Sequence, residues 1–273
     1  MNIIKLLERL SNDELLNKKG SRRESIQHFK NAGRNVALAS IPFGLATLSN
    51  KSSAATMSMA SAAFQASPTE VLNFALTLEY LERNFYQMGM DTNGLIPEAD
   101  RAVIGQILKH EVSHVDFLAA ALGDEAIDEP TFDFTGGDLN LDTFENYQTF
   151  LALSQGFEDT GVRAYKGQAG ALANDDTLLE YALQIHSVEA RHASQIRRMR
   201  NEKGWITQSE TTIPSTFSAI YGGAIPESNT TQGGVNLAGM FGSYGGDDAI
   251  TEAFDEPLTM AEVNAIASIF IAT

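Results

Sequence analysis

Two segments of the chain carry the same pattern of acidic, aromatic and histidine residues. In each segment a glutamate lies seven positions before a tyrosine, and a Glu-x-x-His pattern follows 31 or 32 positions after that glutamate. The first set is Glu79, Tyr86, Glu111 and His114, and the second is Glu158, Tyr165, Glu189 and His192. The two sets are offset by 78 or 79 positions, and flanking apolar residues repeat with them. The repeat predicts two similar halves packed against each other.

The spacing of these residues predicts that they face the interior of a helical protein. Positions i, i+3 and i+7 share one face of an α-helix, and the rest of that face is apolar here. Burying four carboxylates without compensation would cost several kcal/mol for each charge. Two divalent cations would balance four negative charges, and two neutral imidazoles would complete the ligand set. The sequence therefore predicts a di-metal site at the centre of a bundle.

Start and stop signals divide residues 67–204 into four long helices. Ser67, Pro68 and Glu70 form a predicted capping box with proline at the first helical position. The expected helices are 67–90, 97–123, 142–173 and 174–204. The connection over 123–141 is long enough to run the length of a helix, whereas the other two are short. These features predict an all-α fold, an antiparallel four-helix bundle with a long crossover between helices 2 and 3.

At these residues the sequence resembles the ferritin-like di-iron superfamily, in which two helices each supply Glu and two supply Glu-x-x-His. The resemblance implies six metal ligands: Glu79, Glu111, His114, Glu158, Glu189 and His192. It also implies two divalent metal ions, iron or manganese or a mixed pair. Tyr86 and Tyr165 match tyrosines that hydrogen-bond to ligands or undergo oxidation. The sequences of the first helix and of the C-terminal segment resemble those of the desiccation-related branch of this superfamily, which suggests a bacterial stress-response protein.

The resemblance implies reaction with O₂ or peroxide, with Fe²⁺, peroxide or an organic molecule as substrate. We also expect a homo-oligomer. A different class stays open, because a stress-protective or assembly-forming bundle could keep its metals for stability alone. Whether the chain is an enzyme is therefore not decided by the sequence.

The stretch HEVSH, residues 110–114, also matches a zinc hydrolase motif, in which His110 and His114 would hold Zn²⁺ beside Glu111. The repeat argues against this interpretation, because the position equivalent to His110 is Val188. His110 is then expected on the helix surface or next to a ligand. Glu82, whose counterpart is Gly161, is expected beside the site or as an extra ligand, and Asp159 on a solvated face.

Composition excludes several other functions. The chain has no cysteine, which rules out thiolate metal sites and thiol nucleophiles. Its formal net charge is −16, and residues beyond position 34 carry eleven basic against thirty-one acidic side chains. A body this acidic repels nucleic acid and attracts cations. We therefore expect no nucleic-acid partner.

The ends of the chain differ from the bundle. Residues 1–62 combine an amphipathic helix, the pair Arg22 and Arg23, and an uncharged run over 36–49. This order is typical of a twin-arginine export signal, so we expect an exported or periplasmic protein. A cytoplasmic or membrane-associated protein, contacting the membrane through 36–49, is the alternative. Residues 205–273 predict a loop-rich wrap that ends in a helix over 259–271.

Overall fold

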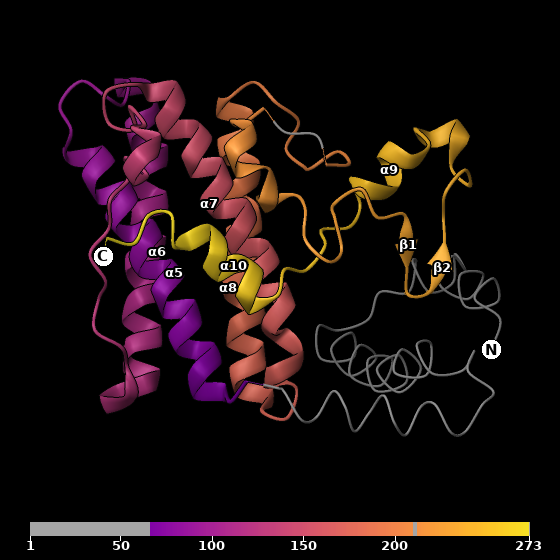
Figure 1. The fold of residues 1–273 in the computed structure, drawn as a ribbon, viewed down its shortest axis with the longest axis horizontal. Coiled ribbons are helices and arrows are strands. Elements are labelled where there is room, and N and C mark those ends of the chain that lie inside the picture. Colours follow the sequence, from indigo (N-terminus) through magenta and orange to yellow (C-terminus); the bar gives the residue numbers. More distant parts are fainter. Residues whose placement is uncertain (1–65, 210–211, 273) are drawn as a thin grey trace, which may run out of the picture. The chain divides into compact units, whose positions relative to one another are not determined.

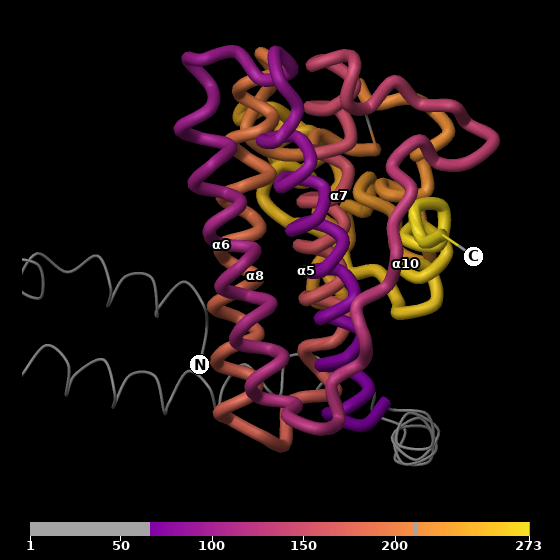
Figure 2. Tube along the Cα trace, turned by 90° about the vertical axis from the view of Figure 1, so that its left-hand side faces the viewer, coloured from indigo at the N-terminus to yellow at the C-terminus, as the bar shows by residue number. Residues whose placement is uncertain are grey.

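A computed structural model describes residues 66–209 and 212–272. The long helices are α5 (Pro68–Asp91), α6 (Glu98–Leu122), α7 (Tyr147–Gln168) and α8 (Asp176–Met199). They pack as two hairpins, α5 with α6 and α7 with α8, and form the predicted all-α bundle (Figures 1 and 2). The predictions of export and of membrane contact fall on residues outside the described range. Within that range, no helix combines the length and apolar character needed to cross a membrane.

Local signals place most helix ends where the sequence predicts them. The Ser67 side chain accepts from the backbone of Glu70, and the Glu70 side chain accepts from the backbone of Ser67, which completes the capping box. Helix α6 ends at Gly123 as expected. The predicted start of the third helix near Asp142 is wrong, and the predicted ends of the third and fourth helices at 173 and 204 each lie five residues too far along the chain. Asn146 caps the helix by accepting from the Gln148 amide, while Asp142 accepts from the side chains of Asn146 and Thr149.

The long connection between α6 and α7 crosses the bundle and meets the end of the chain. It contains the short 3₁₀ helices η1 (Gly123–Glu125) and η2 (Gly137–Leu139), and it runs beside α5 (Figure 2). The Asp133 amide donates to the carbonyl of Phe270 over 2.8 Å, and Phe132 pairs with Ile271 in an antiparallel bridge. This pairing takes up the segment that the sequence assigned to the final helix, α10 (Met260–Ala267), which is therefore shorter than predicted.

The C-terminal segment is a series of short elements. The elements are η4 (Ser215–Ile220), β1 (Thr231–Gln232), β2 (Val235–Asn236), η5 (Gly242–Tyr244), α9 (Asp247–Thr251) and α10. A further short helix, η3 (Ala169–Leu172), belongs to the bundle and joins α7 to α8. The two strands are antiparallel, with Thr231 opposite Asn236 and Gln232 opposite Val235. Helices η4 and α10 both pack against α7. The described part of the C-terminal segment therefore covers part of the bundle through η4 and α10.

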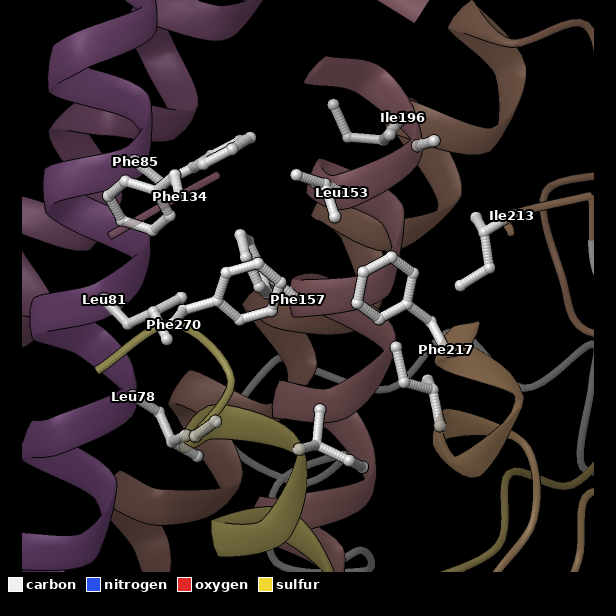
Figure 3. Packing of buried hydrophobic residues seen from close by; sticks show 14 of the residues in the cluster. Leu78, Leu81, Phe85, Phe134, Leu153, Phe157, Ile196, Ile213, Phe217 and Phe270 are labelled. Carbon is white, nitrogen blue, oxygen red and sulfur yellow. The ribbon is translucent and has the colours of Figure 1, made fainter. Parts of the chain in front are cut away.

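Aromatic side chains join this wrap to the bundle core (Figure 3). The ring of Phe157 on α7 lies 5.0 Å from Phe85 on α5 and 4.9 Å from Phe270, between ring centroids. Phe270 in turn stacks on Phe217 of η4 at 5.9 Å. All four side chains are buried, and each contributes about 1.5–3 kcal/mol of hydrophobic stabilisation. The C-terminal segment therefore shares one core with the helices.

Backbone contact between α7 and the wrap leads to a prediction at Gly167. A Cβ atom at this position would lie 1.9 Å from the carbonyl oxygen of Leu258, so we expect Gly167→Ala to destabilise the protein by about 1–3 kcal/mol. The matched control is Gly170→Ala, where an added Cβ meets no heavy atom within 4 Å. Urea unfolding of both variants measures the difference. Equal stability of the two variants would contradict this packing.

Candidate metal centre

The structure brings all six predicted ligand residues together in the centre of the bundle. They come from all four long helices: Glu79 from α5, Glu111 and His114 from α6, Glu158 from α7, Glu189 and His192 from α8. The four glutamates have no exposed surface, and His114 and His192 are 8% and 4% exposed. Apolar residues border this cluster on both sides along each helix. Their arrangement agrees with the prediction, while their role as ligands stays a proposal.

The first of two overlapping groups surrounds His114. Its Nδ1 lies 3.1 Å from Oε2 of Glu79, 3.0 Å from Oε2 of Glu111 and 3.2 Å from Oε1 of Glu189. One candidate ligand atom from each of these four residues lies within 4.8 Å of the others. Three carboxylates and one imidazole therefore converge on a volume the size of a cation site.

The second group surrounds His192 in the same way. Its Nδ1 lies 2.9 Å from Oε1 of Glu111, 3.2 Å from Oε2 of Glu158 and 3.7 Å from Oε2 of Glu189. Glu111 and Glu189 belong to both groups, and each directs one oxygen toward His114 and the other toward His192. Two cations, if bound, would therefore share Glu111 and Glu189, whereas Glu79 and Glu158 each belong to one group only.

The hydrogen bonding of the cluster tests whether metal ions fit it. Oε1 of Glu111 and both carboxylate oxygens of Glu189 are buried, and none accepts a well-directed hydrogen bond, although a histidine Nδ1 lies 2.9–3.7 Å from each. Buried acceptors are normally satisfied, so these three oxygens on the two shared residues call for a better-placed partner. Oxygen and imidazole donors suit iron and manganese as well as zinc. The donor set fits a pair of divalent cations.

Protonation of several groups reduces the negative charge of the cluster when no cation is present. Burial and the nearby Glu189 raise the pKa of Glu79 to about 8, and burial raises the pKa of Glu158 well above its usual range. Burial opposes a charged imidazole, but the surrounding carboxylates outweigh it and raise the pKa of His114 and of His192. Cations would displace these protons, so metal affinity should increase with pH.

Both predicted tyrosines donate to the outer glutamates, and each crosses to the other half of the repeat. The hydroxyl of Tyr86 donates to Oε1 of Glu158, and the hydroxyl of Tyr165 donates to Oε1 of Glu79, both over 2.5 Å. Burial, together with the carboxylate that each one faces, raises the pKa of both phenols well above the usual range. The tyrosines therefore stay protonated and orient the outer carboxylates.

Comparison with known families agrees with this geometry. A family model described as a ferritin-like domain matches residues 67–202. Residues 67–202 form a ferritin-like domain. No curated protein matches the chain significantly. The matched range covers the four long helices and the crossover of the ferritin-like domain, whereas the C-terminal segment after position 202 lies outside it.

His110 is directed away from both groups of the ferritin-like domain. Neither candidate metal group among the described residues includes it. Instead its Nδ1 lies 2.8 Å from Nε2 of His192, on the side of that ring opposite the carboxylates. A zinc site of the HEVSH type needs both His110 and His114 as ligands, so this geometry disfavours the hydrolase interpretation. Burial and the adjacent His192 lower the pKa of His110.

Glu82 lies beside the ferritin-like site but outside both groups of candidate ligands. It is 3% exposed, and burial, followed by the charge of Glu189, raises its pKa well above the usual range. Its counterpart Gly161 leaves the space that it needs, because a Cβ at Gly161 would lie 3.4 Å from Oε1 of Glu82. Of the two predictions for Glu82, a position beside the site or a role as an extra ligand, the structure agrees with the first.

The prediction for Asp159 is wrong, because this residue does not lie on a solvated face. It is 2% exposed, and its carboxylate accepts from Arg197 and from the hydroxyl of Tyr221. Tyr221 belongs to the C-terminal wrap, which covers this face of α7. No local signal around Asp159 could reveal a cover that comes from sixty residues further along the chain.

Proposed function

We propose that the protein is a di-metal carboxylate protein of iron or manganese that reacts with O₂ or peroxide. The observation that carries the proposal is the pair of overlapping groups sharing Glu111 and Glu189, three of whose oxygens are buried without a well-directed hydrogen bond. When bound, two such ions would supply Lewis acidity and electrons to O₂ or peroxide. An oxidase, a ferroxidase and a peroxidase are all compatible with this site.

The residues around the cluster support a role in oxidation chemistry. Tyr86 and Tyr165 each donate a phenol proton to an outer carboxylate, so O₂ or peroxide could take one electron from either ring while the proton passes to that carboxylate. Tyr165 also borders an apolar cavity of about 20 Å³ between the four helices, whose wall includes Leu78, Leu118 and Ile185. A space of this size accommodates one small molecule. The apolar lining suits O₂, and Tyr165 connects this space to the cluster through its hydrogen bond to Glu79.

Anaerobic loading followed by exposure to oxidant tests the proposal. We expect the purified protein to bind two Fe²⁺ per chain and then to consume O₂ or hydrogen peroxide. The same protein loaded with Zn²⁺ is the control and should be silent, because zinc has no redox chemistry. Metal analysis gives the stoichiometry, and an oxygen electrode or a peroxide assay gives the consumption.

The possible outcomes separate the candidate functions. Two bound metals without consumption of either oxidant would favour the non-enzymatic, stress-protective bundle. Zinc-dependent peptide hydrolysis would revive the HEVSH interpretation. Absence of metal binding would overturn the di-metal proposal itself.

A further inference from the structure

Besides Glu82 and Gly161, the two halves of the repeat differ at position 110, whose side chain contacts a proposed ligand. His110 places its Nδ1 2.8 Å from Nε2 of His192, and the two rings are nearly parallel, with an interplanar angle of 9°. The equivalent position in the second half is Val188, which has no polar side-chain atom. A valine cannot give His114 the contact that His110 gives His192. The two ligand groups therefore contain equivalent ligands, but only His192 has a neighbouring histidine that can hydrogen-bond to it.

The hydrogen-bond direction follows from the chemistry of imidazole. Nδ1 of His192 faces the carboxylates, so a cation held there takes the lone pair of that nitrogen and leaves the proton on Nε2. Nε2 then donates to Nδ1 of His110, whose own proton lies on its Nε2. The side-chain amide of Gln106 lies 2.8 Å from that atom, and a half-turn of the amide presents its oxygen as the acceptor. Gln106 is exposed, so the series of hydrogen bonds from His192 through His110 ends at the protein surface.

We propose that His110 is a positioning residue that fixes the ring orientation and tautomer of His192. This makes the cation position bounded by Glu158 and His192 bind more tightly than the position bounded by Glu79 and His114. The inference rests on the di-metal function proposed above. Partners that orient a metal-bound histidine typically contribute a factor of about 10–100 to metal affinity.

A double-mutant comparison isolates this effect at one position. Glu79→Ala leaves only the His192 group complete, whereas Glu158→Ala leaves only the His114 group complete. His110→Val, which copies the residue of the other half, should weaken Co²⁺ binding about 10–100-fold in the Glu79→Ala background. It should leave binding unchanged in the Glu158→Ala background. Calorimetric titration gives the dissociation constants, and circular dichroism confirms that each variant is folded.

A conservative variant separates hydrogen bonding from packing. His110→Asn keeps an acceptor close to the original Nδ1 position, so it should restore most of the affinity in the Glu79→Ala background. Equal weakening by His110→Val in both backgrounds would overturn the inference, as would failure of His110→Asn to restore binding. If the wild-type protein binds two Co²⁺ ions and His110→Val has no effect, only this inference fails. If the wild-type protein binds none, the proposed function fails with it.

Discussion

Glu111→Ala is expected to abolish binding of both metal ions, whereas Glu79→Ala should abolish only one. The reason is that Glu111 belongs to both ligand groups and directs one oxygen to each, 3.0 Å from Nδ1 of His114 and 2.9 Å from Nδ1 of His192. Glu79 belongs to the His114 group alone. The two variants remove the same side chain from neighbouring buried positions, so each serves as the matched control for the other.

The loss in affinity should be large. Losing the partner of a metal ligand already costs about 10–100-fold, and removing a ligand itself should cost more. Metal analysis after equilibration with Fe²⁺ or Mn²⁺ should therefore give two ions per chain for wild type, one for Glu79→Ala and none for Glu111→Ala. Equal losses in the two variants would mean that Glu111 does not bridge the two positions.

Arg163→Ala is the second variant with a large expected effect, and it acts on stability. The guanidinium of Arg163 is fully buried on α7. It donates to four backbone carbonyls of the C-terminal wrap, those of Ile220, Gly222, Ile225 and Glu256. Its Nε also lies 2.8 Å from Oε1 of Glu227, which is itself buried. One side chain therefore holds several turns of the wrap against the bundle.

Removing this side chain leaves a buried carboxylate and several buried carbonyls without their partner. Breaking a buried ion pair from one side typically costs about 3–5 kcal/mol, so we expect Arg163→Ala to lose at least that much free energy of unfolding. Arg83→Ala is the control, because Arg83 pairs with Glu129 at a partly exposed position and should cost no more than about 1 kcal/mol. Urea unfolding gives both values.

Limited proteolysis shows where the loss of Arg163 acts. Cleavage between Ile220 and Glu256 should become faster in Arg163→Ala than in wild type, because this segment loses its anchor. Similar stability of the two arginine variants, or unchanged cleavage of the wrap, would show that Arg163 does not hold it.

The sequence alone determines the four helices and the six residues that meet between them. Helix ends depend on local rules such as the capping box at Ser67, and the direction of each side chain depends on the 3.6-residue period. The repeat adds a second, independent argument, because chance does not easily place Glu, Tyr and Glu-x-x-His twice at an offset of 78 or 79 positions. Helix ends and side-chain directions can therefore be predicted from residues that are close in sequence, without knowledge of distant contacts.

Only the tertiary structure decides what surrounds those six residues. The burial of Asp159 depends on Tyr221, and the buried charge of Arg163 depends on carbonyls that follow more than fifty residues later. The role of His110 depends on a ring on α8, eighty-two positions away. The outer face of a helix carries no periodic signal for a segment that covers it from far along the chain. Its neighbours are therefore fixed by packing in three dimensions, which local spacing does not encode.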